Sequence, residues 1–79
     1  MTEITIDRSL ARELIENNLA VITKDIETIL ESWNQDSADE MIERTRRGEL
    51  PEAEVDAIAL TNLLEKKQEL EKLLADIGG

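Results

Sequence analysis

The sequence predicts an all-α protein, in which two long helices form an antiparallel hairpin and a short helix lies between them. Apolar residues recur at alternating steps of four and three in both halves of the chain, which is typical of helices that pack along a seam. Between the halves, residues 34–51 contain the Asn, Ser, Gly and Pro that end and restart helices. The 79 residues allow one core, so a single domain is expected.

The first long helix is expected over residues 8–34. Asp7 is a good N-cap, because its carboxylate can accept hydrogen bonds from the free amides of the first turn. We expect Trp33 to be buried where this helix meets the corner between the other two. The predicted core or dimer seam of the helix consists of Ile15, Leu19, Ile22, Ile26, Ile29 and Trp33.

An extended arm is expected at residues 1–7, where Thr2, Ile4 and Ile6 can share one face of a short strand. The arm either pairs with its own copy in a dimer or lies on the helices.

The short helix is expected over residues 38–47, because Ser37 and Glu40 form a capping box and Gly48 suits the position after a helix end. Pro51 suits the first turn of a helix, so the second long helix is expected over residues 51–77. This helix contributes to the seam the residues Leu63, Leu70, Leu73 and Ile77.

Both long helices carry apolar faces that are wider than one partner helix can cover. Two arrangements would cover them. In the first, which we expect, two copies form a four-helix bundle closed by two-fold symmetry. In the second, a monomeric three-helix bundle forms when the short helix folds over the groove.

Two adjacent lysines, Lys66 and Lys67, interrupt the apolar face in the middle of the second long helix. In an antiparallel hairpin this point lies opposite Asp25. We therefore expect Asp25 within salt-bridge reach of Lys66 or Lys67, in the same chain or across the dimer. The alternative is that both lysines extend into solvent.

The composition argues against several classes of function. Nineteen acidic and nine basic residues give a net charge of −10, which opposes direct binding to nucleic acid. No Cys or His is present, so disulfides and the usual zinc or haem ligands are excluded. The serines have no histidine to activate them, and the paired carboxylates suggest a solvated surface, so we expect neither an enzyme nor a cofactor. No signal peptide or membrane span is evident, and a cytoplasmic protein is expected.

The segment between the long helices is a possible partner surface, since its carboxylates could imitate phosphates and its arginines could hold an anionic group. The arginines could equally complement the dipole of the short helix. The residues of this surface are Asp36, Asp39, Glu40, Glu43, Arg44, Arg46, Arg47, Glu49, Glu52 and Glu54.

The stretch ITIDRSLARELI, residues 4–15, resembles the start of small accessory proteins of phages and mobile elements, which are often helical hairpins of unknown role. A short strand followed by helices is also similar to ribbon-helix-helix antitoxins. The first helix here is longer than in that family, and residues 1–6 contain no basic side chain to read a DNA groove.

Three functions are therefore considered. The first is a homodimeric interaction or assembly protein. The second is an acidic inhibitor of a basic nucleic-acid-binding complex, of the anti-restriction or anti-CRISPR type. The third is an antitoxin-like partner of a basic toxin.

Overall fold

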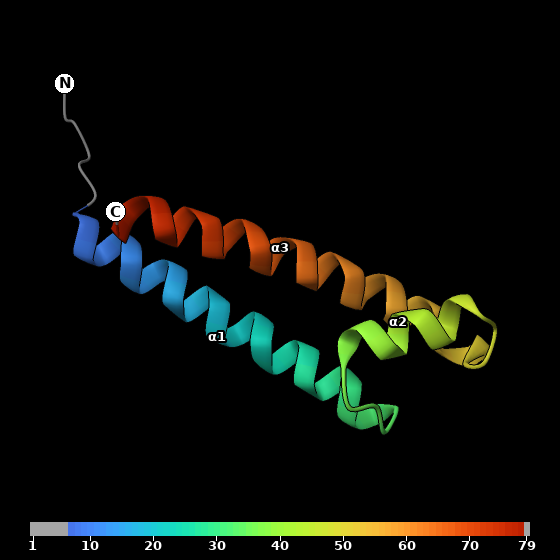
Figure 1. Ribbon diagram of the computed structural model, residues 1–79. Coiled ribbons are helices and arrows are strands. Elements are labelled where there is room, and N and C mark those ends of the chain that lie inside the picture. Colours follow the sequence, from blue (N-terminus) through green and yellow to red (C-terminus); the bar gives the residue numbers. More distant parts are fainter. Residues whose placement is uncertain (1–6, 79) are drawn as a thin grey trace.

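In the computed structural model, which describes residues 7–78, the chain is an antiparallel helical hairpin with a short helix at one end (Figure 1). The long helices α1 (Arg8–Ser32) and α3 (Glu54–Gly78) lie side by side. The short helix α2 (Ala38–Arg46) and the 3₁₀ turn η1 (Pro51–Ala53) connect them. No strand occurs in residues 7–78, so the predicted all-α hairpin is confirmed. The predicted arm, apart from Asp7, lies outside the described residues.

The hairpin is long and thin. Its dimensions are 55 × 24 × 19 Å, and its radius of gyration is 16.2 Å. A compact chain of this length would have a radius of gyration of about 12 Å. The elongated shape leaves much of each long helix without a neighbour.

Helix ends follow the expected caps, with a small difference at the end of α1. Asp7 accepts a hydrogen bond from the Ser9 amide at 3.3 Å, and Ser37 accepts one from the Glu40 amide at 3.2 Å. The first helix ends at Ser32, two residues earlier than expected. The reason is that Asn34 adopts a φ of 52°, which no α-helix can contain.

The second long helix begins differently from the prediction. Pro51 starts a 3₁₀ turn, in which the Ala53 amide donates to the Leu50 carbonyl at 3.1 Å, and the α-helix begins only at Glu54. Gly48 adopts the predicted left-handed conformation, with a φ of 79°. Together these two turns bring α2 back against α3, with which it makes most of its contacts.

The core lies at the α2 end of the hairpin. Met41 of α2 and Leu60 of α3 are fully buried there, and the half-buried Leu30 and Leu64 pack around them. The residues that form this cluster are Ile22, Ile26, Met41, Ala53 and Leu60. Ala53 of η1 is fully buried in this cluster.

The predicted seam is only partly buried within one chain. Three of its α1 residues are buried, namely Ile15, Ile22 and Ile26. Half-buried positions are Leu19, Ile29, Trp33, Leu63, Leu70 and Ile77.

Leu73, predicted for the core or dimer seam, is 48% exposed within one chain, because α3 turns Ala57 and Leu60 toward α1 and α2 and Leu73 lies on another side of the helix. Its place in a dimer seam stays a prediction, whereas the expected burial of Trp33 needs correction. Trp33 is half-buried rather than buried, since it is the C-cap of α1 and stands at the edge of the core.

Candidate interaction surface

A side-chain hydrogen bond joins the end of α1 to the start of α3. The indole Nε1–H of Trp33 donates to Oδ2 of Asp56 at 2.7 Å, and both side chains are half-buried. Asp56 is not among the residues of the predicted partner surface, and this contact was not predicted from the sequence. The signal available in the sequence was general, namely that a tryptophan near the core requires an acceptor for its N–H. The contact joins two helices.

The arginines of the predicted partner surface are all engaged by neighbouring carboxylates. Arg44 pairs with Glu40 at 2.8 Å, and Arg47 pairs with Glu49 at 2.9 Å. Arg46 lies 3.5 Å from its own partner, Glu43. An incoming anion would therefore have to compete with three local ion pairs, which argues against a phosphate clamp.

The remaining acids of that surface point into solvent. None of them takes part in an ion pair within residues 7–78, and none is buried. These free carboxylates are Asp36, Asp39, Glu52 and Glu54. They make this end of the hairpin negative but do not converge on a common point; among the described residues, no cluster of acids is arranged to hold a metal ion.

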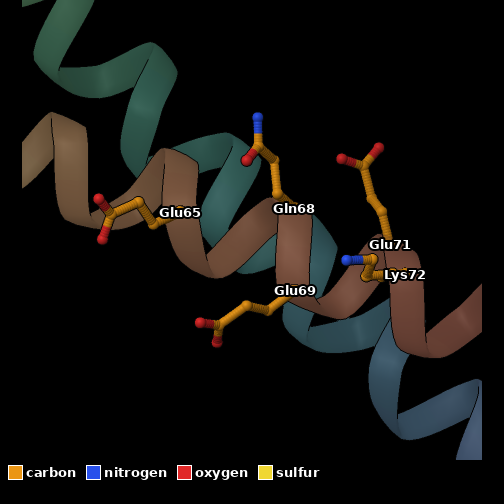
Figure 2. Close-up of a pocket in the computed structure, with 5 residues that line it drawn as sticks. All are labelled: Glu65, Gln68, Glu69, Glu71 and Lys72. Carbon is orange, nitrogen blue, oxygen red and sulfur yellow. The ribbon is translucent and has the colours of Figure 1, made fainter.

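A second acidic surface lies on α3, shown in Figure 2. Its side chains are Glu65, Gln68, Glu69, Glu71 and Lys72. All five come from one helix, and Figure 2 shows Gln68 and Glu71 pointing to one side while Glu69 points to another. The surface of a single helix is convex, so these groups cannot enclose a substrate.

Large apolar side chains form an exposed stripe on α1. Leu10 is 48% exposed, Leu14 is 50% exposed and Val21 is 59% exposed. Their spacings of four and seven residues place them on one side of the helix. No described residue of α2 or α3 buries them.

A groove runs between α1 and α3 beside this stripe. From α1 it is lined by Asn18, Val21, Ile22 and Asp25, and from α3 by Leu63, Lys66 and Leu70. Leu73 follows Lys66 by seven residues and so lies on the same side of α3. The stripe and the groove together form the open face, which consists of Leu10, Leu14, Asn18, Val21, Asp25, Leu63, Lys66, Leu70 and Leu73.

The short helix does not cover the open face. It forms a different groove with α3, lined among others by Ile42, Ala57 and Thr61. Thr61 lines the groove with α2, whereas Leu63 lines the groove of the open face. These two residues are two positions apart, so their side chains leave α3 in directions that differ by about 200° around the helix axis. The open face therefore lies on the side of the hairpin away from α2.

The ion pair expected inside one chain is absent. The ion pairs in residues 7–78 are the three around α2, and none of them includes Asp25, Lys66 or Lys67. Asp25 and Lys66 nevertheless line the same groove from opposite helices. Lys67 is half-buried and does not line it. The pairing predicted across a dimer stays a prediction.

Comparison with protein families, curated proteins and solved structures finds no match to this chain. Within residues 7–78, no helix has the length and apolar character required to cross a bilayer.

Proposed function

We propose that the protein is a small, acidic, non-enzymatic interaction or assembly protein that acts as a homodimer through its open face. The observation that carries the proposal is the row of exposed apolar side chains, with Leu14 at 50% and Val21 at 59% exposure beside an uncovered groove. A row of exposed apolar side chains beside a groove is a common feature of interaction sites. A four-helix bundle would bury it.

The size of the open face is adequate for a stable dimer. Helices of 25 residues are roughly 37 Å long, and two packed helices present a face about 20 Å wide. Contact over this area would bury on the order of 700 Å² per protomer, close to the usual size of a specific interface. A second copy of the chain has the same elongated open face. In a two-fold dimer the two open faces therefore cover each other, and neither stays exposed for a third copy.

Sedimentation equilibrium tests the proposal with two matched variants. Val21 and Ile58 are both β-branched and both 59% exposed, but only Val21 lies on the open face. We expect the wild type at twice the 8.9 kDa of the chain. Val21→Glu should weaken association by about tenfold or more, because a charge replaces a buried methyl surface in both copies. Ile58→Glu should associate like the wild type.

A wild-type species of 8.9 kDa at high micromolar concentration would contradict the homodimer. Equal effects of Val21→Glu and Ile58→Glu would contradict the open face as its interface.

A basic partner protein is a second candidate, supported by the carboxylates Asp36, Asp39, Glu52 and Glu54, which form no ion pair within residues 7–78. This surface lies at the α2 end, so binding there is compatible with a dimer through the open face. Its signature would be an affinity for a lysine-rich test protein that falls steeply with added salt and falls again when these four acids are changed to amides.

A further inference from the structure

We infer that the second copy docks on the open face in one orientation, with the two-fold axis parallel to the long axis of the hairpin. Asp25 and Lys66 select this orientation by pairing reciprocally across the interface. The inference rests on the proposed homodimer and adds its geometry and the residues that determine it.

The two charges lie on opposite helices of one groove. Asp25 lines it from α1 and Lys66 lines it from the middle of α3. Both side chains are exposed, and neither takes part in an ion pair within residues 7–78. They are charges of opposite sign within an otherwise apolar or neutral groove lining, which also includes Val21, Leu63 and Leu70.

Two-fold symmetry allows two ways of stacking the open faces with their long axes aligned. When the axis runs parallel to the helices, α1 of one protomer lies against α3 of its partner at the same level. Asp25 then faces the Lys66 of the other copy, and this contact occurs twice. When the axis runs across the helices, α1 lies against α1 and α3 against α3. If this axis crosses the hairpin near the level of the two charges, Asp25 faces its own copy and Lys66 faces its own copy.

Charge complementarity therefore distinguishes the two arrangements. An interface excludes water, so like charges placed opposite each other are disfavoured and opposite charges are favoured more than on an open surface. A single charged pair in an apolar interface is a known means of rejecting the wrong orientation or register.

A charge-swap experiment tests the orientation. In homodimers of Asp25→Lys, the introduced ammonium would face Lys66 at both contacts, and in homodimers of Lys66→Asp two carboxylates would face each other twice. In a mixed dimer of the two variants, one contact joins two introduced charges of opposite sign and the other joins the native Asp25 and Lys66. We expect each variant alone to associate about tenfold more weakly than the wild type and the equimolar mixture to recover an affinity within about threefold of it.

Sedimentation velocity with one variant carrying a fluorescent label measures the mixed dimer directly. The double variant Asp25→Lys/Lys66→Asp is the control for folding, because it restores opposite charges both within the chain and across the dimer. Circular dichroism of each single variant, compared with this control, verifies that the helices are intact.

The outcomes separate the orientation from the dimer itself. If the wild type is dimeric but the two variants associate no better together than alone, the reciprocal pairing is overturned and the homodimer stands. Preferred pairing of Asp25→Lys with the wild type would instead indicate the crosswise axis, in which the introduced lysine faces the Asp25 of the other copy, and would also overturn the inference. A monomeric wild type would overturn the orientation and the proposed function together.

Discussion

The indole of Trp33 holds the end of α1 against the start of α3. Its N–H donates to the Asp56 carboxylate at 2.7 Å, across 23 positions of the chain. The other side-chain hydrogen bonds in residues 7–78 join residues no more than four positions apart. This contact is thus a specific polar link between elements that otherwise meet through apolar packing.

Removing the donor or the acceptor of this hydrogen bond should lower the free energy of unfolding. Trp33→Phe keeps a large ring but removes the donor, and Asp56→Ala removes the acceptor. Because the acceptor is charged and half-buried, we expect the double-mutant cycle to give a coupling of about 1 kcal/mol in the free energy of unfolding. Urea denaturation monitored by circular dichroism measures it.

The control for this cycle is Glu54→Ala, which removes an exposed acid from the same first turn of α3. It should show no coupling to Trp33→Phe. Coupling of zero for Asp56 as well would mean that the hydrogen bond contributes nothing to stability.

At the scale of elements, α2 depends on its surroundings. A helix of nine residues is too short to be stable alone in water. It is held by the Ser37 cap, by the buried Met41 and by the return of the chain at Gly48. The conformation at Gly48 determines the direction in which Leu50 and η1 leave the helix, and hence how the core closes.

Gly48 should be required for its backbone conformation alone. A side chain at this position would meet no atom within 4 Å, yet the φ of 79° disfavours residues with a Cβ. We expect Gly48→Ala to lower the free energy of unfolding by about 1 kcal/mol and Gly48→Asn to lower it less, since Asn enters this region more readily. Thermal unfolding of the two variants checks the order. Equal stability of wild type and Gly48→Ala would refute the argument.

At the scale of the whole molecule, charge and shape act in opposite directions. The open face favours association through apolar contact, whereas a net charge of −10 on each chain opposes it.

Salt should therefore strengthen the homodimer. Raising the ionic strength from about 0.01 to 0.15 M shortens the screening length from about 30 to 8 Å and weakens repulsion between the two acidic chains. We expect the dissociation constant to fall by about threefold to tenfold, measured by sedimentation equilibrium, with NaCl and KCl giving the same shift. A dissociation constant that rises with salt would mean that attraction between opposite charges dominates the interface.

The sequence alone determined the helices and their approximate ends. Steps of three and four predicted an apolar seam on α1, of which Ile15, Ile22 and Ile26 are buried within one chain. The caps at Asp7, Ser37 and Gly48 were predicted from residue types. These features were predictable because they depend on neighbours within one or two turns. The charged residues of the candidate partner surface could also be located from the sequence. The sequence does not identify the partner that this surface would bind.

Only the tertiary structure decided which part of each wide apolar face is buried. Periodicity shows that Leu73 and Leu60 are both apolar positions of α3, but not that Leu60 is buried and Leu73 exposed, because that depends on the rotation of α3 against α1 and α2. Pairing of Trp33 with Asp56, and the separation of Asp25 from Lys66 within one chain, depend on the same rotation. Helix rotation is determined by the packing of many side chains at once, and short-range sequence patterns contain little information about it.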